Sequence, residues 1–138
     1  MTQHIKVREA MSQDSLKILT TTSVEEAATL LLKHKLPGAP VINERGELVG
    51  FVSEHDLLKQ LLDSSYHSST SSTVLDVMRA DVVTVSPDDS IIELAQTMAR
   101  IDKPKVYPVA EGGKLIGIIT RGQLLQALIT NRSQPSRV

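Results

Sequence analysis

The sequence repeats itself at an offset of 67 residues, and an internal repeat limits the possible folds more than any other feature of a chain. When residues 11–61 are placed on residues 78–128 without gaps, 13 of the 51 pairs are identical, several times the number expected by chance. The identical pairs include Ser23 with Ser90, Glu26 with Glu93, Ala28 with Ala95, Gly46 with Gly113, Gly50 with Gly117 and Leu57 with Leu124. A one-residue shift in register brings Pro40-Val41 onto Pro108-Val109, which indicates one compensated insertion. The chain is therefore a tandem duplication.

Both copies predict the same order of elements. A short apolar segment (16–19 or 82–85) precedes a stretch with apolar residues at helical spacing, which we expect to end near Pro37 or Pro104. Ser23 with Glu26, and the equivalent Ser90 with Glu93, predict a capping box at the start of each helix. Two apolar strands around a Gly-containing turn follow (39–42 and 48–52; 106–110 and 115–119), and then a leucine-rich helix. The predicted class is α+β, with two tandem β-α-β-β-α repeats.

Composition excludes several classes of protein. The 138 residues carry 15 basic and 16 acidic side chains, which gives no overall field for nucleic acid or an anionic membrane. Aromatic residues make up 2% and Trp is absent, so stacking platforms for single-stranded nucleic acid are not expected. No apolar run reaches the roughly 18 residues of a membrane span. With no cysteine and no secretory signal, we expect a cytoplasmic protein that binds neither nucleic acid nor membrane.

The polar residues divide the chain into four segments. We place the first repeat at 1–66, a Ser/Thr-rich linker at 67–73, the second repeat at 74–130 and a flexible tail at 131–138. The two repeats together are expected to form one module.

The strand-to-helix junctions carry a recognisable motif. Gly50-Phe-Val-Ser-Glu-His-Asp56 and Gly117-Ile-Ile-Thr-Arg-Gly-Gln123 resemble the Gly-hydrophobic-x-Ser/Thr-x-x-Asp signature of the CBS (cystathionine β-synthase) domain. The resemblance extends from Val7 to about Leu128. It implies a Bateman module, in which two repeats pack with pseudo-twofold symmetry around two clefts that commonly bind adenosine-containing ligands. It also implies a homodimer.

The resemblance assigns residues to a first cleft. The carboxylate of Asp56 would accept hydrogen bonds from ribose hydroxyls, and Arg79 and Lys105 would lie near the phosphates. The expected ligand-binding residues of this cleft are Phe51, Ser53, His55 and Asp56 from the first repeat, with Arg79, Val83, Lys105 and Val106 from the second.

A second cleft departs from the family pattern. Gln123 stands where the signature has Asp, and a neutral amide is a weaker acceptor for a ribose diol than a carboxylate is. We therefore expect weaker, altered or absent nucleotide binding here, although Arg121 could meet a phosphate. The expected residues of this cleft are Ser12, Leu16, Leu36, Gly38, Thr120, Arg121 and Gln123.

Structural interpretations of the same residues remain open. Ser53-x-x-Asp56 and Thr120-x-x-Gln123 are also typical helix N-terminal caps, and capping explains Gln as well as Asp. Arg79 and Lys105 also fit solvated surface charges. The four histidines include no helical pair at metal-ligand spacing, so no metal site is expected.

Three functions follow from these alternatives. The first is a stand-alone regulatory module that binds AMP, ADP, ATP or an adenosyl compound, requires no cofactor and modulates a separate protein. The second is a ligand-free structural dimerisation module, because Leu30-Leu31-Leu32 widens the apolar face of its helix. The third, a small enzyme using His55 and Asp56, lacks any recognisable nucleophile arrangement, and we expect no catalysis.

Overall fold

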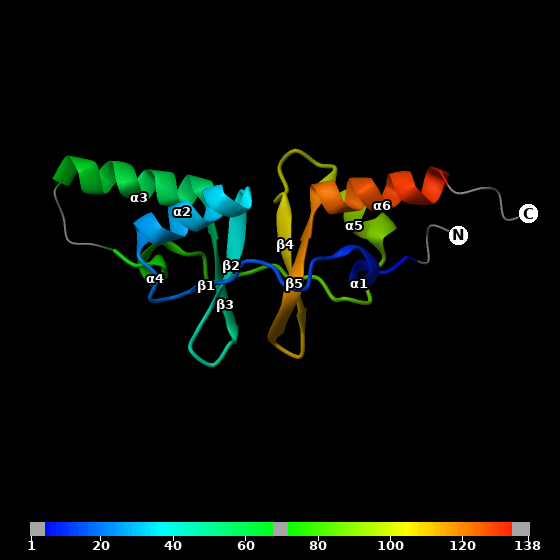
Figure 1. Cartoon of the computed structure of the whole chain (residues 1–138), viewed down its shortest axis with the longest axis horizontal. Helices are drawn as coiled ribbons and strands as arrows, with labels where there is room; N and C mark the ends of the chain where they lie inside the picture. The colour runs from blue at the N-terminus through cyan, green and yellow to red at the C-terminus, as the bar shows by residue number, and fades with distance from the viewer. Residues whose placement is uncertain (1–4, 68–71, 134–138) are drawn as a thin grey trace, which may run out of the picture. The chain divides into compact units, whose positions relative to one another are not determined.

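The computed structural model describes residues 5–67 and 72–133. Figure 1 shows the elements in chain order. They are α1 (Val7–Ala10), β1 (Ile18–Leu19), α2 (Val24–His34), β2 (Gly38–Ile42), β3 (Leu48–Ser53), α3 (Glu54–His67), α4 (Val74–Val77), α5 (Ile91–Met98), β4 (Val106–Glu111), β5 (Lys114–Thr120) and α6 (Arg121–Ser133).

The chain divides into two compact units. The first-repeat unit contains Ser15–Val83 and Gly112–Leu115, and the second-repeat unit contains Met1–Asp14, Thr84–Glu111 and Ile116–Val138. Each unit holds the helices and strands predicted for its repeat, so the expected α+β class with two β-α-β-β-α repeats is confirmed.

A three-stranded sheet forms the centre of the first-repeat unit. Strand β1 pairs with β2 in parallel, and β2 pairs with β3 antiparallel, with a register shift between Val41 and Ile42. The side chains of Val41 and Val52 are fully buried, and they pack with Leu31 of α2 and Leu57 of α3 in one apolar cluster. Helices α2 and α3 therefore hold the strand-to-helix junction at the end of β3 against a rigid core.

The second-repeat unit is built in the same way, with a shorter first strand. Strands β4 and β5 form a two-stranded sheet, and Val85 adds a single parallel bridge to Val109 where the first-repeat unit has β1. Its core contains Leu94 and Met98 of α5 with Ile119 and Leu124 at the end of β5 and the start of α6. Aliphatic side chains make up most of both cores, as the low aromatic content requires.

Each unit is completed by the short helix with which the other repeat begins. Val7 of α1 is fully buried in the core of the second-repeat unit, and Val74 of α4 is fully buried in the core of the first-repeat unit. Arg8 of α1 donates a 2.8 Å hydrogen bond to Asp88, and this bond lowers the pKa of the Asp88 carboxyl. The compact units therefore do not coincide with continuous stretches of sequence.

Three element boundaries differ from the predicted ones. Helix α5 ends at Met98, well before Pro104, and residues 99–103 form turns closed by the Arg100 and Lys103 amides. Met98 is equivalent to Leu31, but α2 continues beyond Leu31 to His34, whereas α5 ends at Met98. The turn after Met98 therefore accommodates the extra residue of the second copy. Helix α3 continues to His67 and α6 to Ser133, which lie in or beside the expected linker and tail. The remainder, 68–71 and 134–138, lies outside the described residues.

Serine caps start the first long helix of each repeat. The Ser23 hydroxyl accepts the Glu26 amide at 3.1 Å, and the Ser90 hydroxyl accepts the amides of Ile92 and Glu93. These bonds form the serine half of the predicted capping boxes. None of the helices in the described part of the chain combines the length and apolar character needed to cross a bilayer.

The segment that follows α1 packs closely against Gly117, and a substitution there tests this contact. A Cβ atom at Gly117 would overlap the carbonyl oxygen of Ser12, whereas a Cβ atom at Gly122 would meet only the Thr120 hydroxyl at 3.8 Å. We expect Gly117→Ala to lower the free energy of unfolding by about 1–3 kcal/mol. The matched control, Gly122→Ala, should raise it by about 0.4–1 kcal/mol because helical Ala restricts the unfolded chain. Urea denaturation measures both, and equal stability of the two variants would contradict this packing.

Candidate functional site

A backbone pairing positions the residues of the site in the first-repeat unit. Phe51 of β3 and Arg79, which follows α4, exchange two backbone hydrogen bonds of 2.9 Å each. The chain approaches closely here, because a Cβ atom at Gly50 would lie 2.9 Å from the Arg79 carbonyl oxygen and would also overlap Met78. This pairing fixes Arg79 beside the junction between β3 and α3.

Asp56 is the centre of the side-chain cluster at that junction. Its Oδ2 atom accepts hydrogen bonds from the Ser53 hydroxyl at 2.8 Å and the Ser53 amide at 3.2 Å, and the Ser53 hydroxyl accepts the Asp56 amide. Arg79 Nε lies 3.5 Å from the same Oδ2 atom. The Asp56 side chain is only 14% exposed, yet Oδ1 has no hydrogen-bonding partner among the described residues. The cap therefore leaves one carboxylate oxygen free to accept.

The remaining residues predicted for the first cleft have different environments. Phe51 lies in β3 and is half-buried, His55 is exposed on the first turn of α3, and Val83 is 67% exposed. Lys105 and Val106 belong to the second-repeat unit, where Val106 is buried and the Lys105 carbonyl accepts the Arg121 amide. Within one unit the structure thus brings together Phe51, Ser53, Asp56 and Arg79.

The second-repeat unit has the same backbone pairing with different side chains. Ser12 exchanges two hydrogen bonds with Ile118, at the positions equivalent to Arg79 and Phe51. The Gln123 Oε1 atom accepts the Thr120 amide at 2.9 Å, and its Nε2 atom donates to the Ser12 hydroxyl. Both ends of the Gln123 amide group are therefore used inside the protein, whereas Asp56 has a free oxygen.

The other residues predicted for the second cleft are divided between the units. Thr120 and Arg121 lie beside Gln123, at the end of β5 and the start of α6. Leu16 and Leu36 pack against the apolar core of the first-repeat unit. Gly38 begins β2 in the same unit, and a Cβ atom there would lie 2.6 Å from the Phe51 ring.

The two clusters form a matched set of contacting pairs, each drawn from the residues that the family resemblance assigns to one cleft. Asp56 faces Arg79 in one unit, and Gln123 faces Ser12 in the other, with each member 67 residues from its counterpart. One unit therefore has an ion pair where the other has a neutral hydrogen bond. The repeat offset contains this signal, because it aligns Arg79 with Ser12 as well as Asp56 with Gln123.

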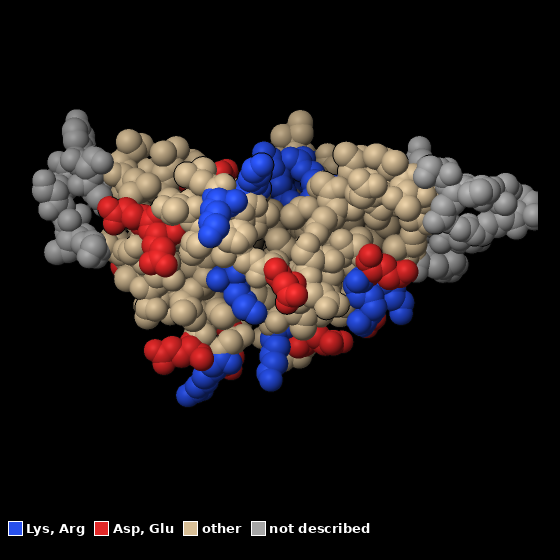
Figure 2. All heavy atoms as spheres, in the orientation of Figure 1, with Lys and Arg blue, Asp and Glu red and all other residues tan. Residues whose placement is uncertain are grey.

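The charges outside the clusters are mixed in sign. Figure 2 shows basic and acidic side chains interspersed on the surface of the chain. Such a surface lacks the extended single-sign field that attracts nucleic acid. Across residues 5–67 and 72–133, no three His, Cys, Asp or Glu side chains are grouped so that they could hold a metal ion.

Solved structures of similar proteins share this fold. CBSX2 of Arabidopsis thaliana, solved in complex with AMP, has 30% sequence identity and a TM-score of 0.78, covering 92% of this chain and 98% of its own. A putative acetoin utilization protein (AcuB) of Vibrio cholerae has 27% identity and a TM-score of 0.80, covering 94% of this chain and 95% of its own.

Curated relatives are similar over much of this chain and often much longer. MJ1225, an uncharacterized protein of Methanocaldococcus jannaschii, is 28% identical over 88% of this chain, which spans 42% of that protein. An A-adding tRNA nucleotidyltransferase of Aquifex aeolicus is 33% identical over 90% of this chain, which spans 14% of that enzyme. The sequence model of the CBS domain matches residues 7–63 and again residues 74–130. The chain therefore belongs to the CBS domain family and carries two copies of that domain.

Proposed function

We propose that this chain is a regulatory module that binds an adenosine-containing ligand at the Ser53–Asp56–Arg79 cluster of the first-repeat unit. The observation that carries the proposal is the free Oδ1 atom of Asp56, on a side chain that is otherwise held rigidly. Membership of the CBS domain family and the similarity to CBSX2, whose structure contains AMP, support the choice of ligand class.

The cluster offers a suitable group for the ribose and another for the phosphate of a nucleotide. The free oxygen of Asp56 is an acceptor for a ribose diol, and a charged acceptor makes a hydrogen bond about twice as strong as a neutral one. Arg79 is 64% exposed, and its two terminal nitrogens donate no side-chain hydrogen bond among the described residues, so they can donate to a phosphate. The predicted contributions of His55, Val83, Lys105 and Val106 are part of the same proposal.

Regulation requires that the ligand change an equilibrium. A ligand shifts a protein between two arrangements only when it binds one of them more tightly. In our proposal the arrangement that AMP favours also changes the affinity for a separate protein. The proposal includes a homodimer, which the exposed Leu32, Leu58 and Leu125 side chains support.

A structural dimerisation module is the second candidate function. The observation that favours it is the second-repeat unit, where Gln123 and Thr120 form a helix cap that needs no ligand. The binding experiment that follows separates the two functions.

Asp56→Asn tests the ligand site. The substitution keeps the size of the side chain and removes its charge, and we expect AMP binding to weaken by roughly tenfold or more, the value of a charge-assisted hydrogen bond. Isothermal titration calorimetry with AMP measures the loss. Asp76→Asn is the matched control, because Asp76 also caps a helix of the same unit through the Thr73 amide. Its AMP affinity should equal that of the wild type.

Two results would contradict the ligand proposal. Equal AMP affinity of Asp56→Asn and the wild type would show that AMP does not bind at Asp56. A ligand at 100 times its dissociation constant should raise the free energy of unfolding by about 2.7 kcal/mol. If AMP, ADP, ATP and S-adenosylmethionine all leave the melting temperature unchanged at 100 times a micromolar dissociation constant, this stabilisation is absent. The structural dimerisation module would then be the better description.

The matched pairs predict one strong site per chain and a way to create a second. We expect calorimetry to give one AMP per wild-type chain, because both ends of the Gln123 amide group are already bonded. The double variant Ser12→Arg, Gln123→Asp copies the Arg79–Asp56 pair into the second-repeat unit and should raise the stoichiometry to two. Gln123→Asp alone should bind the second AMP more weakly than the double variant.

Gln126→Asp is the control for this gain. Gln126 lies exposed on the same helix, so the substitution adds an equal charge away from the cluster and should leave one AMP per chain. A wild-type stoichiometry of two would show that the Gln123 cap does not block binding.

A further inference from the structure

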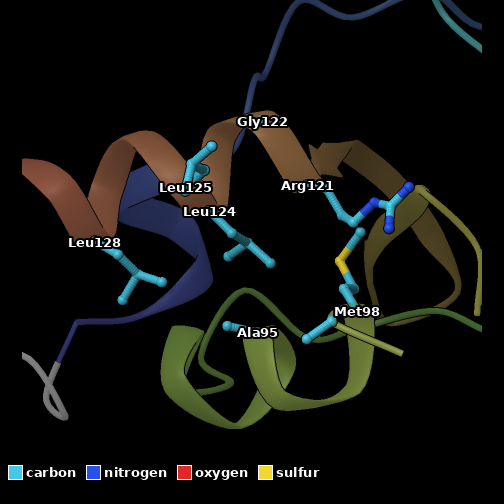
Figure 3. Close-up of a pocket in the computed structure, with 8 residues that line it drawn as sticks. Ala95, Met98, Arg121, Gly122, Leu124, Leu125 and Leu128 are labelled. Carbon is cyan, nitrogen blue, oxygen red and sulfur yellow. The ribbon is translucent and has the colours of Figure 1, made fainter. Parts of the chain in front are cut away.

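The second-repeat unit contains an apolar groove between its two long helices. Figure 3 shows Met98 of α5 and three leucines of α6 around the hollow (Leu124, Leu125 and Leu128), with Arg121 at one end. The volume of the groove is about 340 Å³, which is in the range of small-molecule sites. Among the described residues that line it, Arg121 alone carries a charge. An apolar groove that ends in one cation suits a ligand with an apolar chain and an anionic end.

The charge of Arg121 is not neutralised inside the protein. Across residues 5–67 and 72–133 the ion pairs involve other cations, namely Lys6, Arg8, Arg79 and Arg100. The Arg121 side chain is half-buried, and its backbone amide is fixed by a 3.1 Å hydrogen bond to the Lys105 carbonyl. A cation at the start of a helix does not stabilise that helix, so the stability of α6 does not explain Arg121. An anion at this end of the groove would meet a positioned cation without a competing partner.

The first-repeat unit provides a comparison within the same chain. Its groove lies between α2 and α3, measures about 370 Å³ and is lined by Leu57, Leu58 and Leu61, at the positions equivalent to the three leucines of α6. Glu54 is the first residue of α3, at the position equivalent to Arg121, and it also lines its groove. The two grooves therefore have similar linings and opposite charges, so an anionic ligand would be attracted to one and repelled by the other.

The length of the groove limits the length of the ligand. Seven residues separate Arg121 from Leu128 at the two ends of the α6 lining, and a helix rises about 1.5 Å per residue, which gives roughly 10 Å. An extended chain advances about 1.2 Å per bond, as an extended polypeptide does. A chain of about eight carbons would therefore fill the groove.

We propose that the second-repeat groove binds a medium-chain carboxylate, with the carboxylate at Arg121 and the alkyl chain along the leucines of α6. The groove shares no residue with the Ser53–Asp56–Arg79 cluster, so this inference goes beyond the proposed nucleotide site and does not rest on it.

A series of chain lengths tests the apolar part of the groove. Isothermal titration calorimetry with hexanoate, octanoate and decanoate measures three affinities. Each methylene buried from water strengthens binding by about two- to fourfold, so octanoate should bind roughly fourfold or more tightly than hexanoate. Decanoate should gain little over octanoate, because its last carbons would extend beyond Leu128. An affinity that does not depend on chain length, or that rises by the same factor to decanoate, would overturn the inference.

Arg121→Gln tests the charged end of the groove. The substitution removes the cation and keeps a good helix former at the start of α6, and we expect octanoate affinity to fall about fivefold or more. The matched control is Arg45→Gln, because Arg45 is exposed in the turn between β2 and β3 and lines neither groove. Its octanoate affinity should equal that of the wild type. Circular dichroism checks that both variants are folded, and equal affinities of the two variants would overturn the inference.

Methionine methyl signals locate the bound ligand. In protein labelled with carbon-13 at the methionine methyl groups, octanoate should shift the Met98 signal, since Met98 lines the groove. The Met78 signal should stay in place, because Met78 packs against the core of the first-repeat unit. A Met98 signal that does not move in a saturating titration would overturn the inference.

Glu54→Arg tests whether charge selects the groove. The substitution gives the first-repeat groove the cation that Arg121 supplies in the second, so calorimetry should detect two octanoates per chain instead of one. A stoichiometry that stays at one would overturn the selection by charge.

A second copy of the chain is the competing occupant of the groove, because Leu125 also supports the proposed homodimer. Octanoate should bind the wild type with a dissociation constant on the order of 1 mM or lower, as expected for a ligand of its size. No binding up to roughly 10 mM would overturn the inference and favour the second copy as the occupant. AMP titrations of the same samples decide the nucleotide site separately, because Asp56→Asn should leave octanoate affinity unchanged.

Discussion

The pairing of two short backbone segments with the last strand of each unit supports everything else in this structure. Arg79 pairs with Phe51, and Ser12 pairs with Ile118, through two hydrogen bonds each. These bonds position the short helices α1 and α4, whose valines complete the two cores. They also determine which side chain faces the strand-to-helix junction. Gly50 and Gly117 make the approach possible, because a Cβ atom at either position would overlap the neighbouring segment. The same local contact thus serves stability and the candidate site.

The duplication has kept this backbone contact and changed the side chains on it. A carboxylate with a free oxygen remains at Asp56, beside a cation that is mostly exposed to water. At Gln123 the same position makes an internal hydrogen-bond network with Thr120 and Ser12. Capping explains the helix start in both units, since it needs only an acceptor three residues into the helix. Ligand binding requires a further acceptor, and this requirement distinguishes the two copies.

Much of the fold could be predicted because its signals are local and occur twice. Apolar periodicity, the capping serines and the Gly turns located most of the long helices and strands within a few residues. The short α1 and α4 were missed, although Thr73-x-x-Asp76 fits a capping box and Val7 aligns with Val74 at the repeat offset. The end of α5 was also placed too late, because periodicity does not reveal where an inserted residue is absorbed. For the site, the family resemblance grouped Asp56 with Arg79 and Gln123 with Ser12, but atomic contacts were needed to see that the glutamine amide group is already engaged.

The exchange of the short helices has a consequence for how such a chain can arise. A polypeptide with a single repeat has no second repeat to supply the helix that its core lacks. One route to a complete core is to pack its own leading helix into that core, with a different chain connection. A second route is to donate this helix to an identical molecule and to receive the same helix in return. The second route is a domain swap. Fusion of two such genes would convert an exchange between molecules into one within a single chain, and each half would then be free to diverge as Asp56 and Gln123 have done.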